Sequence, residues 1–100
     1  MERLNEFELE VLECLPVEPI GLSLAELADG LLGNRSPAAR GKVKSALDSI
    51  ASAMGGLHVG HGNDRFGGYA VLMYALRKSD IPRVREFALR RNKVISGDSA

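Results

Sequence analysis

A run of basic residues is the first feature of this chain that could do chemistry. The stretch NRSPAARGKVKSALDSI, residues 34–50, contains four of them within ten positions: Arg35, Arg40, Lys42 and Lys44. Guanidinium and ammonium groups at this density bind phosphate oxygens, and the hydroxyls of Ser36 and Ser45 can hydrogen-bond to phosphates or base edges. The stretch therefore predicts the binding of a polyanion rather than a reaction.

A further candidate cation lies in a glycine-rich segment later in the chain. Arg65 follows Asn63 and Asp64 and precedes Gly67 and Gly68, which are residue types that form tight turns. If strands lie on both sides, Arg65 stands at the tip of a hairpin, where a long side chain can reach a phosphate. The alternative is an ordinary flexible turn that leaves Arg65 in solvent.

The sequence contains no recognisable catalytic or metal-binding pattern. His58 and His61 are three positions apart, which in a strand puts them on opposite faces, and no cysteine or carboxylate cluster joins them. Neither a GxxxxGK phosphate loop nor a Ser, His and acid arrangement can be assembled. Cys14, in the apolar pattern VLECL, is predicted to be a buried small hydrophobic side chain. We therefore expect no enzyme, no metal and no cofactor.

Charge is distributed unevenly along the chain, although the formal net charge is zero. Residues 1–30 contain eight acidic residues and one basic residue, whereas residues 31–100 contain twelve basic and five acidic residues. This asymmetry predicts one acidic and one basic face, and a basic face can bind phosphate whatever the total charge. The alternative is that the two halves pack together and neutralise each other.

The apolar content indicates one folded domain, expected over residues 1–92 of the 100. No apolar run approaches the roughly 20 residues of a membrane span, and the acidic start MERLNEFELE lacks the features of a secretory signal. The expected location is cytoplasmic, without membrane contact.

Apolar residues at three- and four-residue intervals predict helices over about residues 4–15, 24–32 and 37–54. Ser23 and Glu26 form a capping box for the second helix, and Ser36 followed by Pro37 starts the third. Between the first two helices, Ile20 and Leu22 form either a very short strand or side chains that fill the core.

The remaining elements have a different period. Residues 57–76 alternate as two strands around the turn NDRFGG, and the second strand is apolar on both faces, so both faces should be covered. Another helix is predicted over about residues 80–92, followed by a loose tail over 93–100. The predicted fold class is mainly α with a small β-hairpin, an α+β chain.

The outer surface of the third helix is predicted from its core stripe. With Val43 towards the core, about 100° of rotation per residue places small side chains outermost. They are Ala38, Gly41, Ser45, Asp48 and Ser52, with Lys42 on one side and Lys44 on the other. Such a surface can approach DNA closely but offers few side chains that read bases. The alternative is that it packs against another helix, with the lysines solvated.

The order of helix, turn, helix and hairpin resembles the winged helix-turn-helix family over about residues 4–76. The resemblance rests on SLAELADGLL in the second helix, KVKSALDSI in the third, and HVGHGNDRFGGYAVL as the wing. It implies a double-stranded DNA ligand, with the third helix in the major groove and the wing on the backbone.

Together these features predict a bacterial-type transcriptional regulator. The expected DNA-binding residues are Arg35, Ser36, Arg40, Lys42, Lys44, Ser45 and Arg65. A homodimer through the last helix is a further expectation. The alternative function is a winged-helix protein interaction module that does not bind DNA, with the acidic first helix and the small-residue third helix as docking faces.

Overall fold

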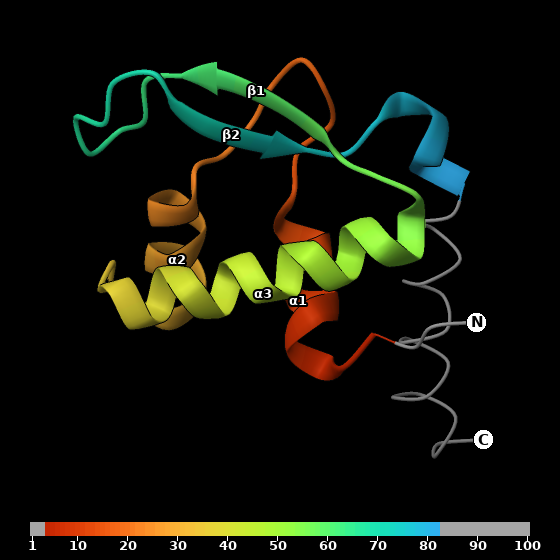
Figure 1. The fold of residues 1–100 in the computed structure, drawn as a ribbon, viewed down its shortest axis with the longest axis horizontal. Coiled ribbons are helices and arrows are strands. Elements are labelled where there is room, and N and C mark those ends of the chain that lie inside the picture. The colour runs from red at the N-terminus through yellow and green to blue at the C-terminus, as the bar shows by residue number, and fades with distance from the viewer. Residues whose placement is uncertain (1–3, 83–100) are drawn as a thin grey trace, which may run out of the picture.

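Three helices and one antiparallel hairpin form the described part of the chain, residues 4–82, in a computed structural model (Figure 1). The elements are α1 (Glu6–Cys14), α2 (Leu24–Leu32), α3 (Pro37–Met54), β1 (His58–Gly62) and β2 (Val71–Ala75), with a short 3₁₀ helix at Lys78–Asp80. The predicted α+β class is confirmed in this coarse form. Beyond Pro82, the predicted last helix and tail lie outside the described residues.

Side-chain caps define where the helices begin. Ser23 Oγ accepts the backbone N–H of Glu26 at 3.1 Å, while the Ser23 N–H donates to Glu26 Oε1 at 2.9 Å, so the predicted capping box is confirmed. Ser36 caps α3 as predicted, accepting the N–H of Ala39 at 3.2 Å. A second capping box, of Asn5 with Glu8, starts α1 and was not part of the sequence expectation.

The core lies between the three helices and the hairpin, which runs along one side of them (Figure 1). Val43, Leu47 and Ile50 of α3 are buried as the periodicity predicted. Side chains of the other helices and of β2 meet them. These are Val11, Leu12, Leu27, Ala28 and Tyr74. The position and rotation of α3 are therefore fixed by apolar burial along its whole length.

The strand β2 pairs on both of its edges. On one side it pairs with β1, in a register that sets Val59 opposite Tyr74 and His61 opposite Leu72. On the other side Leu22 exchanges two hydrogen bonds with Tyr74, of 3.0 and 2.8 Å. The short strand expected near Leu22 is thus present as a single bridge. Ile20 does not fill the core, since 67% of it is exposed.

Two further expectations are wrong. Cys14 is exposed, because α1 ends at this residue and buries the stripe of Val11 and Leu12 instead. Partial burial, and then the charges of Glu13 and Glu10, raise the pKa of its thiol. The second wrong expectation is that both faces of β2 are covered.

Leu72 shares the helix-facing side of the strand with buried Tyr74, yet 44% of it is exposed. A groove separates this end of the hairpin from the starts of α2 and α3, so the helices leave Leu72 partly uncovered.

Candidate nucleic-acid interface

The outer surface of α3 carries the small side chains that the sequence placed there. All five members of the predicted arc are exposed: Ala38, Gly41, Ser45, Asp48 and Ser52. Their exposure follows from the burial of Val43 and Ile50 on the opposite side of the helix. The backbone of α3 is therefore accessible to a large partner along this surface.

Lys44 and Lys42 lie on different sides of this surface, as predicted. Two positions along a helix correspond to about 200° of rotation. Lys44 Nζ donates to Asp48 Oδ1 at 2.6 Å, and this hydrogen bond raises the pKa of the lysine. Lys42 Nζ lies 4.6 Å from the ring centroid of Phe7 in α1. Both ammonium groups thus have intramolecular partners, although the ion pair is exposed and weak.

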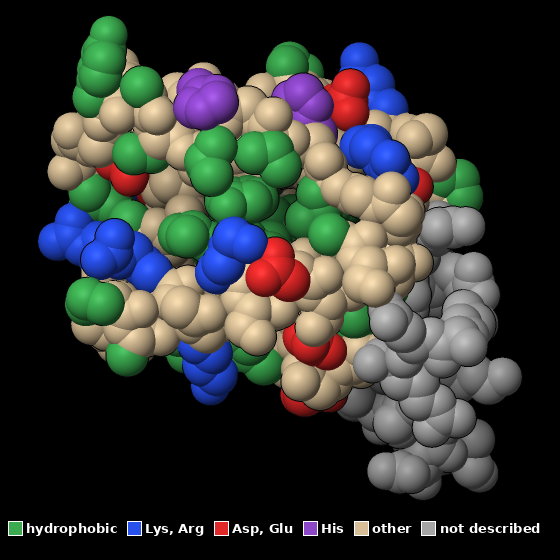
Figure 2. Space-filling model, viewed as in Figure 1, with side chains coloured by type: hydrophobic (Ala, Val, Ile, Leu, Met, Phe, Trp, Pro, Cys, Tyr) green, Lys and Arg blue, Asp and Glu red, His purple; other side chains and the backbone are tan. Residues whose placement is uncertain are grey.

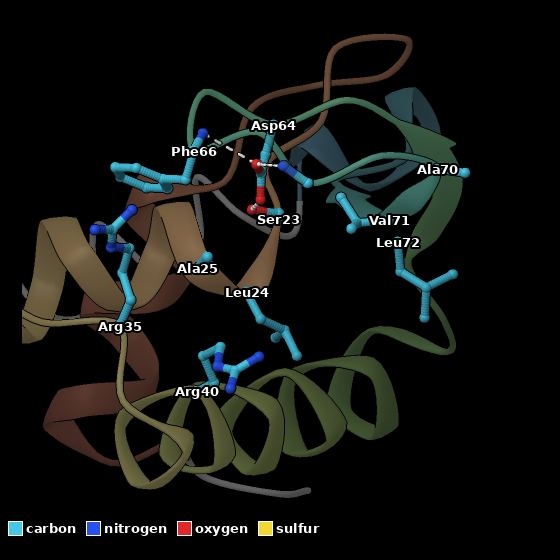
Figure 3. Close-up of a pocket in the computed structure, with 11 residues that line it drawn as sticks. Ser23, Leu24, Ala25, Arg35, Arg40, Asp64, Phe66, Ala70, Val71 and Leu72 are labelled. Carbon is cyan, nitrogen blue, oxygen red and sulfur yellow. Dashed lines mark hydrogen bonds between the residues drawn. The ribbon is translucent and has the colours of Figure 1, made fainter.

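Arg35 and Arg40 border one groove of about 780 Å³ between the start of α3, the start of α2 and the hairpin (Figure 3). The Arg35 guanidinium carbon lies 3.9 Å from the ring centroid of Phe66. Among the described residues, the Arg40 side chain makes no hydrogen bond or ion pair, so its five donors are accessible. These two arginines are the predicted cations that the fold brings together.

The hairpin loop is fixed by one carboxylate. Asp64 Oδ1 accepts the backbone N–H groups of Gly68 at 2.7 Å and Phe66 at 3.0 Å. Asp64 Oδ2 accepts the hydroxyl of Ser23 at 2.9 Å (Figure 3). The Gly68 N–H is the main cause that lowers the pKa of Asp64, and Ser23, Phe66 and the charge of Arg35 act in the same direction. The loop is therefore closed on itself and attached to α2.

The capping box of α2 also holds Arg65. While Glu26 Oε1 caps the helix, Glu26 Oε2 lies 3.5 Å from Arg65 Nε and 3.4 Å from the Arg65 backbone nitrogen. The Arg65 side chain is still 69% exposed, but its guanidinium leans on α2 rather than standing alone at a hairpin tip. Ser23 and Glu26 thus serve two purposes, as a helix start and as an anchor for the loop.

The seven predicted residues therefore separate into groups. Arg35 and Arg40 share the groove, Ser45 lies on the exposed arc of α3, and the Ser36 hydroxyl caps that helix. Lys42, Lys44 and Arg65 contact Phe7, Asp48 and Glu26, on three different elements. These last three cations do not converge on one point.

Several residues of the groove were not singled out from the sequence. Leu24, Phe66 and Leu72 line it, and each comes from a different part of the chain. Figure 2 shows Lys and Arg side chains at the α3 start and hydrophobic side chains in the hollow between α3 and the hairpin. The one sequence signal was the apolar character of β2 on both faces, since an apolar side chain without a cover can line a groove.

Comparisons with protein families, with curated proteins and with solved structures found no match. Within residues 4–82, none of the helices has the length and apolar character needed to cross a membrane.

Proposed function

We propose that the protein binds double-stranded DNA as a winged helix-turn-helix transcriptional regulator. In this proposal α3 enters the major groove, the loop 63–68 lies beside the phosphate backbone, and the last predicted helix pairs two copies in the cytoplasm. The order of elements supports the proposal, as does the bridge between Leu22 and Tyr74, which adds a third strand position to the hairpin.

One observation carries the proposal. The exposed small-residue arc of α3 starts beside two arginines, Arg35 and Arg40, that no acidic side chain among the described residues neutralises by an ion pair. Small side chains allow a helix backbone to approach a duplex, and arginines at its edge supply phosphate contacts. Binding is then dominated by electrostatics, and the hydroxyl of Ser45 on the arc can hydrogen-bond to bases or phosphates.

Salt-dependent binding to a mixed-sequence duplex tests this function. Fluorescence anisotropy over a range of salt concentrations is expected to show affinity falling steeply with salt. Because each phosphate contact contributes about 0.9 to the logarithmic salt slope, the double variant Arg35→Ala with Arg40→Ala should lower the slope by about 2. Lys78→Ala, an exposed lysine in the 3₁₀ helix near the other end of α3, is the matched control and should bind normally.

A second variant separates the two cations that border the groove from the other three. The triple variant Lys42→Ala, Lys44→Ala, Arg65→Ala removes more charge, yet should lose less affinity per charge, since Lys44 and Arg65 pair with the carboxylates of Asp48 and Glu26 and Lys42 does not line the groove. Absence of binding at low salt, or equal binding by the Arg35 and Arg40 double variant, would contradict the proposed function.

The alternative is a protein interaction module without DNA binding. Lys42, Lys44 and Arg65 contact partners on three different elements, and this favours the alternative, because a DNA surface gains most from cations that converge. Recovery of a protein partner, together with no salt-sensitive binding to DNA, would support this function instead.

A further inference from the structure

The groove beside Arg35 and Arg40 has an apolar lining that phosphate contact does not explain. Leu24 of α2, Phe66 of the loop and Leu72 of β2 line it; in Figure 3 Leu24 and Leu72 point into the groove, while the Phe66 ring lies over Arg35. Leu72 is 44% exposed although it lies on the helix-facing side of the strand. Burying this lining would be favourable, since apolar area removed from water contributes roughly 25 cal/mol per Å².

The charges around this lining favour an anionic occupant. Arg35 and Arg40 are both cationic, and the carboxylate of Asp64 is the one acid in the lining. Asp64 already accepts three hydrogen bonds, from Gly68, Phe66 and Ser23. Its oxygens are thus occupied, whereas Arg40 retains its donors. A carboxylate would therefore find a guanidinium partner, with the geometry for a two-bond contact.

An apolar lining beside two arginines fits a peptide better than it fits DNA or a small molecule. A phosphate backbone would not cover Leu24 and Leu72. Small-molecule sites bury about 70–90% of their ligand, whereas this hollow is open to solvent along the face shown in Figure 2. A peptide can place apolar side chains on the lining and carboxylates on the arginines at the same time.

We propose that this groove binds a short acidic peptide segment of a partner protein, with Leu or Phe side chains against Leu24, Phe66 and Leu72 and Glu or Asp carboxylates on Arg35 and Arg40. The binding itself does not depend on the proposed DNA function. The consequence of peptide binding does depend on the DNA function. If DNA contacts the same two arginines, the acidic segment competes with DNA and releases the protein from it.

Two matched peptides test the site on the full chain. The first is fluorescein-labelled Glu-Glu-Leu-Phe-Glu-Leu-Glu, and the second has Ser in place of Leu and Phe. Anisotropy should show the apolar peptide binding at least about tenfold more tightly, because burial of Leu and Phe side chains contributes more than the 1.4 kcal/mol of a tenfold change. Equal binding by the two peptides would show attraction of charge alone and would overturn the proposal.

Variants of the protein then locate the bound peptide. Leu72→Ser should weaken binding of the apolar peptide and leave binding of the Ser peptide unchanged. Arg40→Ala should weaken binding of both peptides. Ile20→Ser is the matched control, since Ile20 is more exposed than Leu72 and does not line the groove. Amide chemical shifts of the unmodified protein, titrated with the apolar peptide, provide a measurement that no folding defect can disturb. Shifts centred on α1 instead of Leu24, Phe66 and Leu72 would refute the site.

Competition distinguishes this proposal from the DNA proposal. Unlabelled apolar peptide should displace a labelled duplex, whereas the Ser peptide should do so about tenfold less well. If the apolar peptide binds the groove and no duplex binds at low salt, the groove is supported and the DNA function fails. If the duplex binds and the apolar peptide does not, the DNA function is supported and the peptide site in the groove is refuted.

Discussion

The two ends of α3 are built in opposite ways. At the C-terminal end, Arg77 Nη2 donates to the Met54 carbonyl at 2.9 Å and Arg77 Nε donates to Asp80 Oδ2 at 2.7 Å. Asp80 is itself buried, and Ile50 and Met54 are fully buried. At the N-terminal end, Arg40 has no such partner among the described residues. One arginine completes the fold, and the other remains accessible to a ligand.

This difference shows how one helix can be both fixed in position and exposed to a ligand. The last carbonyls of a helix lack intrahelical donors, so the Arg77 side chain satisfies one of them at Met54. Gly55 then takes a left-handed conformation with φ of 76°, which ends the helix. With that end held by hydrogen bonds and burial, the direction of α3 is set, and its first turns can expose small side chains without losing their position.

The largest expected effect comes from the buried half of α3. Replacing Ile50 by Ala removes a side chain with no exposed area, and is expected to lower the free energy of unfolding by about 2–5 kcal/mol. Ser45→Ala, on the exposed arc of the same helix, should change it by less than about 0.5 kcal/mol. Urea unfolding measures both. A similar loss in the two variants would mean that the arc is covered and that the contrast within α3 is false.

A smaller effect is expected from a matched pair of arginines. Arg77→Met should lower the urea midpoint, since it leaves the Met54 carbonyl without this donor and the buried Asp80 carboxylate without its cation. Arg40→Met should leave the midpoint unchanged, because no bond to a described residue is lost. For duplex binding the two variants should exchange roles: Arg40→Met should weaken binding, and Arg77→Met should leave it unchanged. An equal midpoint for both variants would refute the assigned roles.

The elements of this fold could be predicted from local patterns. The capping box of Ser23 and Glu26, the start of α3 at Ser36, and the exposed arc all depend on spacings of three or four residues. Local chemistry decides such features, so the sequence suffices. The error at Cys14 is also local, since one residue at a helix end turns from the buried stripe into solvent.

The candidate site could be predicted only in part, because its contacts join distant segments. The turn residues around Arg65 predict a hairpin tip or an ordinary flexible turn, and nothing in its neighbourhood indicates that Glu26, 39 positions away, pairs with it. Likewise the hydrogen bond from Ser23 to Asp64 spans 41 positions. Nor could the sequence predict that Arg35 and Lys42 would lie over aromatic rings, since that depends on where Phe66 and Phe7 come to lie.

The smallest expected effect concerns two glycines in exposed helix positions. A Cβ added at Gly41 of α3, or at Gly30 of α2, would meet no atom within 4 Å. Since glycine inside a helix costs about 0.5–1 kcal/mol relative to alanine, Gly41→Ala should raise the free energy of unfolding by up to this amount. Gly30→Ala should also raise it, by less, because Gly30 lies in the last turn of its helix.

Duplex binding distinguishes the two glycines. Gly41 lies on the arc that is proposed to enter the major groove, so its new methyl group should weaken binding several-fold even as the fold becomes more stable. Gly30 lies outside that arc, so Gly30→Ala should bind as the unmodified protein does. If Gly41→Ala gains stability and keeps full affinity, the arc does not approach the duplex closely. Binding would then rest on Arg35 and Arg40 alone, at the same groove that we assign to the acidic peptide.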